Sequence, residues 1–562
     1  MLLNSKTLPK SFSEVVDHIL QSNFARLELL VLNGAENERI PDALSKRSPI
    51  RRALDLVLSA HRRRHLLFGL YQRWDGRHIN PATDPDAQVD CTAKLAGVDS
   101  ISVIPIVKRF VHRFPADAIE LIRMKKLDVL IRFGFNILRG DILAAARYGI
   151  WSYHHGDGDF YRGGPSHFWE IVERNPLSGV MLQVLTEELD AGMVLCKGWF
   201  ATQPGLSRAQ NCVQPYWGAS TFVIQKLREL HQYGWEHVSR NTSSNAVYGG
   251  KKAIYTAPTN MEMLRWLGPV AVRKTLRRLI RRPKIEHWRL AIRTGPTLIA
   301  DATGSPNLAG FRWIESAPGH FYADPFLIEA DGRIWVFFED FDYATSKGVI
   351  SCAELRNDGT FEPMVVLERP YHLSYPCVFR AGNDIFMIPE SSANETVELY
   401  RCTRFPDRWV LENSLLQLPG VDTTIWMEAG VFWLFVTIQE PRGYGIQLSL
   451  FSASTLTGKW SPHPANPIST DVRRSRGAGP IFRRNDKLFR PSQDCSGHYG
   501  RRFMLNEIVT LNGDRYEERP CVTVDPIWAP GLVGTHTYTH LDQLEVIDGC
   551  VPLPAASVLG SR

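Results

Sequence analysis

The pattern of apolar and polar residues changes once along the chain, near residue 236. Before that point, short apolar runs at 27–34, 99–107 and 127–134 predict strands. Stretches at 11–22, 115–126 and 141–149 lie between or after these runs and predict helices. Strands that alternate with helices are typical of a parallel α/β sheet, so residues 1–235 are expected to form an α/β domain.

Beyond residue 286 the helical periodicity disappears, and short apolar or aromatic runs recur between turn residues. A similar lead-in precedes each run, and the lead-ins lie near Asp324, Tyr375, Asp422, Gly479 and Gly534. The repeat is about 50 residues long, which is typical of a β-propeller with four strands in each blade. The sequence therefore predicts an all-β five-bladed propeller over 286–562, with a strand at 288–293 that closes the ring against the last blade.

Residues 236–285 are expected to link the two halves. Within them, 272–284 is rich in Lys and Arg and carries Leu276, Leu279 and Ile280 on one side of a helix. This pattern predicts a basic amphipathic helix. Two interpretations remain open, a solvated helix between domains or a peripheral contact with anionic lipid or a phosphorylated substrate.

Composition narrows the class of protein. Of 562 residues, 44% are hydrophobic and 22% charged, as in ordinary globular proteins, and a net charge of +6 does not favour nucleic acid as a partner. The nine cysteines are scattered without a CxxC pair, which favours reduced thiols and a cytoplasmic location. No run approaches the roughly 18 apolar residues of a membrane helix, and the first residues lack the apolar core of a secretory signal.

The strongest candidate chemistry lies between residues 151 and 195. His154 is expected at the carboxyl end of a buried strand, where open α/β sheets place reactive groups, and Asp190 lies in a loop between two further strands. His154 and His155 are adjacent and would point to opposite faces of a strand, so no metal site is expected there.

In this region the motifs LDVLIRFGFNIL, YRGGP and GVMLQVLTEELDAG resemble the N-terminal domain of folate-dependent formyltransferases, over roughly residues 1–235. The resemblance implies a Rossmann-like fold, 10-formyltetrahydrofolate as co-substrate and transfer of its formyl group to a primary amine. It implies catalytic roles for His154 and Asp190. The family's asparagine falls on Ser152, a departure, which makes Ser152 the third catalytic candidate. Three donors to the oxyanion remain open, namely the Ser152 hydroxyl through a water, His155 and Asn136.

The same resemblance implies further site residues. The family's pterin-binding backbone corresponds to Phe133, Gly134, Phe135, Asn136, Ile137 and Leu138. The turn Arg162, Gly163 and Gly164 is expected to act structurally, because glycine allows close approach of backbone.

In the second half, FYADPFL, WVFFED, HLSYPCVF, MIPES and RPSQDC resemble the five-bladed propeller of the glycoside hydrolase 43-like superfamily. The likeness is greatest to the propeller-type N-terminal domain of glucosamine inositolphosphorylceramide transferases, over roughly 286–550. It implies a central funnel lined by carboxylates. The candidates are Asp324, Glu390 and Asp422, with Arg490, Asp494 and His536 in equivalent positions.

Together the two resemblances imply formylation of the amine of an amino sugar, nucleotide- or lipid-linked, in polysaccharide biosynthesis, with a sugar-binding propeller. One alternative is a glycoside-acting hydrolase or transferase whose first half is a degenerate formyltransferase-like domain. Another is a non-catalytic protein of polysaccharide assembly.

Overall fold

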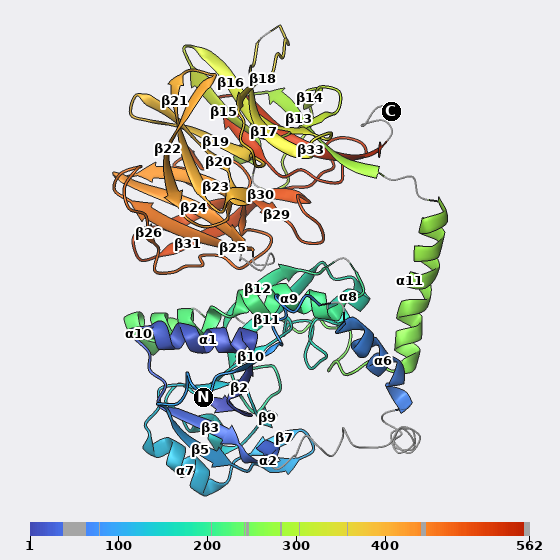
Figure 1. Cartoon of the computed structure of the whole chain (residues 1–562), viewed down its shortest axis with the longest axis vertical. Helices are drawn as coiled ribbons and strands as arrows, with labels where there is room; N and C mark the ends of the chain where they lie inside the picture. Colours follow the sequence, from blue (N-terminus) through green and yellow to red (C-terminus); the bar gives the residue numbers. More distant parts are fainter. Residues whose placement is uncertain are drawn as a thin grey trace. The chain divides into compact units, whose positions relative to one another are not determined.

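The fold was analysed on a computed structural model, which describes residues 1–37, 63–77, 79–203, 205–240, 242, 247–280, 284–302, 304–356, 358–439 and 446–555. The chain divides into two compact units (Figure 1), unit 1 over Met1–Leu279 and unit 2 over Ile280–Arg562. No helix in the described ranges is both long and apolar enough to cross a membrane.

Unit 1 is built on a seven-stranded sheet in the order β12-β11-β10-β8-β1-β3-β5. The parallel strands are β1 (Leu2–Leu3), β3 (Leu29–Asn33), β5 (Asp99–Val103), β8 (Leu130–Arg132) and β10 (Ile150–His154). Two antiparallel strands, β11 (Leu177–Val184) and β12 (Met193–Ala201), extend one edge. Each of the three predicted runs thus contains a strand, and the apolar character of β3 follows from its burial between helices.

Helices cover both faces of this sheet. Helices α1 (Lys10–Gln21) and α10 (Phe222–Arg240) pack on one face, and α7 (Ala116–Met124) packs on the other (Figure 1). The remaining helices are α2 (Gly34–Asn37), α6 (Leu66–Asp75), α8 (Trp169–Glu173), α9 (Arg208–Ala219) and α11 (Asn260–Ile280).

One local expectation is corrected. Residues 141–149 do not form an α-helix but a short 3-10 turn over Asp141–Ala144, between Gly140 and Gly149, which both have positive φ. The basic segment at 272–284 continues α11 as far as Ile280, and most of its side chains lie outside the described residues. The expected linker also contributes Tyr255 and Met263, both buried, to a core cluster of unit 1.

A small three-stranded sheet stands apart from the main sheet of unit 1. It consists of β6 (Ile106–Lys108), β7 (Val111–Arg113) and β9 (Ile137–Leu138). Among the described residues of this unit, β2 (Thr7–Pro9) and β4 (Gln88–Asp90) form a further antiparallel pair.

The described part of unit 2 contains five sheets made almost entirely of antiparallel strands. The first joins β13 (Lys284–Thr294) to the last strand, β33 (Leu544–Pro554), along their whole length, with β14 (Arg312–Trp313) and β32 (Tyr538–Leu541) at the edges. The second holds β15 (His320–Ala330), β16 (Arg333–Asp342), β17 (Lys347–Glu354) and β18 (Met364–Leu367). The third holds β19 (Ser374–Ala381), β20 (Asp384–Glu390), β21 (Val397–Arg404) and β22 (Arg408–Leu416).

The fourth sheet contains β23 (Gly420–Glu428), β24 (Val431–Gln439), β25 (Ile446–Ala453) and β26 (Ser461–Pro462). The fifth contains β27 (Arg476–Gly477), β28 (Phe482–Arg484), β29 (Lys487–Asp494), β30 (Arg502–Leu511) and β31 (Tyr516–Val524). Apolar side chains from neighbouring sheets, such as Phe326, Tyr375 and Leu434, form shared cores. The repeat seen in the sequence therefore corresponds to successive sheets, whose first strands begin at each lead-in.

Candidate functional site

A pocket of about 400 Å³ lies at the carboxyl ends of β8 and β10 in unit 1. Its lining includes Ser152, His154 and Asp190, which the sequence had brought together as catalytic candidates. The lining also includes Asn136, Ile137 and Leu138 from the expected pterin segment, and Arg132.

The other half of that segment packs away from the pocket. The ring of Phe133 stacks on Phe12 with ring centroids 4.3 Å apart, and the Phe135 ring packs on Phe114 at 4.8 Å. A Cβ on Gly134 would lie 2.3 Å from the Asn4 nitrogen, so glycine is required there by close packing against the backbone of the first strand's end.

Both ring nitrogens of His154 are engaged. Its Nδ1 lies 3.3 Å from Asp190 Oδ1, and its Nε2 lies 2.7 Å from the carbonyl oxygen of Tyr161. A carbonyl only accepts, so Nε2 must carry a proton. Burial lowers the pKa of His154, but Asp190, the Tyr161 carbonyl and Glu170 together outweigh this effect, and the net pKa is raised. In this arrangement the imidazole has no free nitrogen to take a proton from an amine in the pocket.

Ser152 is likewise engaged within the protein. Its hydroxyl accepts a hydrogen bond from Arg132 Nη1 at 2.9 Å and donates to the carbonyl oxygen of Tyr153 at 3.3 Å. Of the alternative donors, His155 stacks flat on Tyr216 at 3.8 Å, and burial lowers its pKa well below the usual value. The exposed Asn136 donates its backbone N–H to His112. Ser152 is therefore engaged within the protein, whereas the ring nitrogens of His155 have no hydrogen-bond partner among the described residues, and both His155 and Asn136 line the pocket.

The glycine turn has the structural role expected of it. Gly163 has φ +90 and donates its N–H to Asp190 Oδ2 at 3.0 Å. A Cβ at this position would lie 2.3 Å from the carbonyl oxygen of Tyr255. The hydrogen bond and His154 together lower the pKa of Asp190, although burial of the carboxyl acts in the opposite direction.

In unit 2 three successive sheets share one strained position on their first strand. Asp324 on β15, Tyr375 on β19 and Asp422 on β23 all have positive φ, between 46 and 53, although none is glycine. At each position the register with the next strand shifts in a β-bulge. A bulge re-aims a side chain, and such strain persists only where the surrounding structure holds it in place. The three lead-ins are therefore equivalent structural positions.

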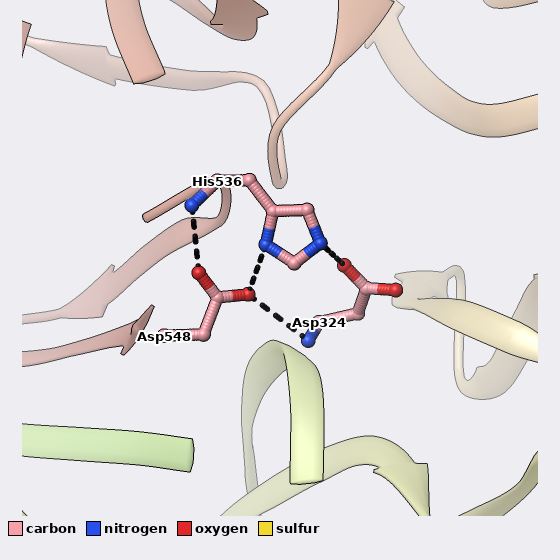
Figure 2. A group of neighbouring side chains, drawn as sticks. All are labelled: Asp324, His536 and Asp548. Carbon is pink, nitrogen blue, oxygen red and sulfur yellow. Dashed lines mark hydrogen bonds and ion pairs between the residues drawn. The ribbon is translucent and has the colours of Figure 1, made fainter. Parts of the chain in front are cut away.

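At the first of these positions Asp324 belongs to a buried network with His536 and Asp548 (Figure 2). The Nε2 of His536 lies 3.5 Å from Asp324 Oδ1, and its Nδ1 lies 2.5 Å from Asp548 Oδ2. Asp548 also accepts the backbone N–H groups of His536, Thr537 and Asp324. These side chains serve one another as donor and acceptor, and their ligand atoms, all within 4.8 Å, have a spacing that a metal ion could also bridge.

At the third position Asp422 lies beside Glu390 and Arg476. The Nε of Arg476 and the amide of Gln493 both donate to Asp422 Oδ2, and Arg476 Nη2 lies 3.7 Å from Glu390 Oε2. Burial raises the pKa of Asp422 to about 7, against the opposing effect of Arg476, and Glu390 raises it further. The Arg476 guanidinium lies over the ring of Tyr499, 4.7 Å from its centroid.

These two groups of side chains interact with each other. Burial raises the pKa of Asp324 to about 6, with His536 opposing and Asp422 adding to the rise. Glu339 on β16 stands opposite Ala323 across the strand pair, and its pKa is raised well above the usual value by burial and then by Asp324, Glu390 and Asp422. We call Asp324, Glu339, Glu390 and Asp422 the carboxylate cluster. Its members come from the second, third and fourth sheets, and all are buried.

At the second position a tyrosine, Tyr375, replaces the aspartate, and its hydrogen bonds give the reason. The Tyr375 hydroxyl lies 2.9 Å from Thr424 Oγ1 and accepts the N–H of Gly479 at 2.7 Å. Tyrosine thus joins the third, fourth and fifth sheets by hydrogen bonds where the neighbouring sheets carry aspartate.

Two funnel candidates lie elsewhere. Arg490 is buried on the second strand of its sheet and forms an ion pair with Glu518 on the outer strand β31. Asp494 pairs with Arg502 at 2.7 Å and accepts the N–H of Ser496. Of the other funnel candidates, Asp324, Glu390 and Asp422 belong to the carboxylate cluster, and His536 contacts it through Asp324.

Four residues of the carboxylate cluster and its surroundings were not predicted from the sequence, namely Glu339, Arg476, Tyr499 and Asp548. Glu339 had a usable signal, because it lies in the run WVFFED that pairs directly with the first lead-in. Arg476, Tyr499 and Asp548 lie at no repeated position, so only the meeting of separate sheets reveals them.

Comparison with known proteins bears on unit 2. Residues 311–526 match the family model for the N-terminal region of glucosamine inositolphosphorylceramide transferase 1. Curated proteins of that name from Oryza sativa subsp. japonica and Arabidopsis thaliana are each 36% identical over 209 residues. The match covers 36% of this chain and 28% or 27% of the relative, so the chain spans well under a third of the proteins it matches.

Among solved structures, a family 117 glycoside hydrolase of Zobellia galactanivorans aligns with 47% of this chain and 90% of its own, at 12% identity and a TM-score of 0.31. A GH43_1 enzyme from Xanthomonas citri solved with xylose aligns with 42% of this chain and 89% of its own, at 10% identity and a TM-score of 0.32. Scores below 0.5 do not by themselves establish a common fold.

These comparisons correct the activity expected from the first half. The curated relatives are named as glucosamine inositolphosphorylceramide transferases and not as folate-dependent formyltransferases, so the predicted formyltransferase activity and its folate keywords are wrong. The engaged nitrogens of His154 and the engaged hydroxyl of Ser152 agree with this correction.

Proposed function

We propose that the chain acts on a sugar in glycosidic linkage, through the carboxylate cluster of unit 2. The observation that carries this proposal is the pair of aspartates, Asp324 and Asp422, held at the same strained bulge of two different sheets. The pKa values of both carboxyls are raised, as expected where acid and base groups are tuned for catalysis.

The pairing of sheets supports a five-bladed propeller for unit 2. The first strand, β13, pairs with the last strand, β33, so a single sheet contains both ends of the unit. Four other sheets follow in chain order, each begun by a lead-in strand. Such an arrangement gives the lead-in strands a common centre, which is where the carboxylates meet.

The cluster supplies the two protonation states that glycosidic chemistry needs. The pKa of Glu339 is raised well above its usual value by burial and by the neighbouring carboxyls, so Glu339 is the candidate general acid toward the oxygen of the bond that breaks. Asp324, whose carboxyl also contacts His536, is the candidate base or stabiliser of the positive charge that develops on the sugar ring. Asp422, held by Arg476 and Gln493, is placed to position the pair.

The charge of the cluster favours a substrate that carries an amine. Four carboxyl groups face one arginine and one histidine, so an ammonium group would relieve the repulsion between them. The relatives' name specifies glucosamine as the sugar and inositolphosphorylceramide as the lipid. An amino sugar and a lipid-linked acceptor or donor are therefore the substrate classes we propose.

The test uses the full chain with aryl glucosaminides and, separately, with a glucosamine donor and inositolphosphorylceramide. Cleavage is followed by absorbance and transfer by mass spectrometry. Asp324→Asn is expected to lower the rate at least about 100-fold, because the loss of a catalytic carboxylate typically costs this much or more. The matched control is Asp331→Asn, because Asp331 is exposed and has the same φ of 53.

Asparagine tolerates this backbone conformation, so both variants should fold. Equal activity in wild type and Asp324→Asn would show that the carboxylate cluster takes no part in the reaction. Equal loss in Asp324→Asn and Asp331→Asn would trace the effect to the backbone and not to the carboxyl.

A further inference from the structure

The hairpin formed by β6 and β7 in unit 1 carries apolar side chains that no part of the described chain covers. Ile104, Ile106, Val107 and Phe110 are 58%, 62%, 54% and 69% exposed, all within seven residues. Singly exposed apolar residues are ordinary, but a contiguous exposed group of this kind marks an interaction surface.

The hairpin is held rigidly at its base. Its strands pair from Ile106–Arg113 to Lys108–Val111, and β7 pairs in parallel with β9. Phe114 is buried against Phe135 directly after the hairpin. The exposed apolar side chains therefore stand on an ordered element, with Arg109 and Phe110 at its tip.

The charge of the hairpin has a single sign. Lys108, Arg109 and Arg113 are exposed, and the sequence from Ser100 to Pro115 contains no Asp or Glu. Within the described ranges, none of these three side chains forms an ion pair. A surface that combines exposed aliphatic and aromatic groups with unpaired cations suits the boundary between lipid headgroups and acyl chains, where both kinds of group are satisfied.

We propose that the β6–β7 hairpin docks unit 1 on an anionic membrane surface. Ile106, Val107 and Phe110 enter the headgroup region, and Lys108, Arg109 and Arg113 lie against lipid phosphates. The partner of β7, strand β9, supplies Ile137 and Leu138 to the pocket of unit 1. Docking of the hairpin would therefore bring the membrane surface near that pocket. The proposal is independent of the chemistry proposed for unit 2.

The experiment is co-sedimentation of the full chain with vesicles of phosphatidylcholine containing 30% phosphatidylserine, compared with phosphatidylcholine alone. Wild type is expected to bind the anionic vesicles and to be released by about 0.5 M salt, because screening weakens the attraction. Phe110→Ser and Arg109→Glu are each expected to lower the apparent affinity about tenfold. Melting followed by circular dichroism checks that both variants fold.

Two substitutions elsewhere are matched controls. Ile527→Ser removes an aliphatic side chain that is 80% exposed in unit 2, and Arg515→Glu makes the same change of charge at an exposed turn. Both are expected to bind as wild type does. Hydrogen exchange provides the second measurement, with protection on vesicle addition expected in peptides over 104–113.

Three results would overturn the proposal. Wild type could fail to bind anionic vesicles. The control variants could weaken binding as much as the hairpin variants do, which would show that binding does not depend on the hairpin. Phe110→Ser could abolish self-association in size-exclusion chromatography without changing vesicle binding, which would make the hairpin an interface between copies of the chain.

Discussion

Asp548 offers the sharpest test of the network around His536 (Figure 2). Its carboxylate is fully buried and accepts three backbone N–H groups, at 2.7, 3.0 and 3.3 Å, besides the imidazole of His536. Replacement by alanine would leave these donors without an acceptor and would remove the partner of a buried histidine.

The expected loss follows from these contacts. Removing one member of a buried ion pair costs about 3–5 kcal/mol. Each buried N–H left unsatisfied costs about 1–3 kcal/mol, although water entering the space would offset part of that. We therefore expect Asp548→Ala to lower the free energy of unfolding of unit 2 by about 4–6 kcal/mol. Asp548→Asn keeps one acceptor oxygen and should lower it by about half as much.

The assay is hydrogen exchange by mass spectrometry at increasing denaturant, read on peptides over 320–330 and 540–552, which report on unit 2 alone. Asp384→Ala, at the exposed first residue of β20 in the same unit, is the control and should stay within about 0.5 kcal/mol of wild type. A loss below about 1 kcal/mol for Asp548→Ala would refute the reasoning, because the network would then contribute nothing that water cannot replace.

Three further predictions concern stability. The folded pKa of Asp324 is raised to about 6 from an ordinary 3.8, so its contribution to stability is present at low pH and is lost as pH rises from about 4 to 6. Denaturant titrations at several pH values should show wild type losing about 3 kcal/mol more than Asp324→Asn over that window. Tyr375→Phe leaves the buried N–H of Gly479 without its acceptor and should lower the free energy of unfolding by about 1–3 kcal/mol in urea. Gly163→Ala must displace the Tyr255 carbonyl and adopt φ +90, so its melting temperature should fall by several degrees, whereas Gly97→Ala, which meets nothing within 4 Å, should leave it unchanged.

The amino-acid sequence alone predicts much of the secondary structure and the division of its elements into an α/β half and an all-β half. Apolar runs predicted strands that the structure places at β3, β5 and β8. For β3 and β8 the reason is that burial on both faces of a parallel sheet leaves an uninterrupted apolar signal. The repeat of about 50 residues predicted successive sheets, because each sheet must bury its faces against its neighbours. The helix expected at 141–149 failed, since two glycines with positive φ limit that segment to a short turn.

Which of the predicted site residues lie in contact with one another depends on the tertiary structure. Ser152, His154 and Asp190 do share a pocket, as their motif predicted, yet their donors and acceptors are directed to Arg132 and to backbone carbonyls. No pattern along the chain specifies the direction of a hydroxyl or an imidazole proton, because it depends on atoms that approach from other elements.

The same holds for the carboxylate cluster. Asp324 and Asp422 could be picked out from their repeated lead-ins, but Arg490 and Asp494, chosen by the same reasoning, are used inside one sheet. Glu339 completes the cluster from β16, while Arg476 contacts Asp422 and Asp548 contacts Asp324 from strands far apart in the chain. A repeat marks equivalent backbone positions, whereas the charge that a buried carboxyl carries depends on side chains that only the packing of separate sheets brings within reach of it.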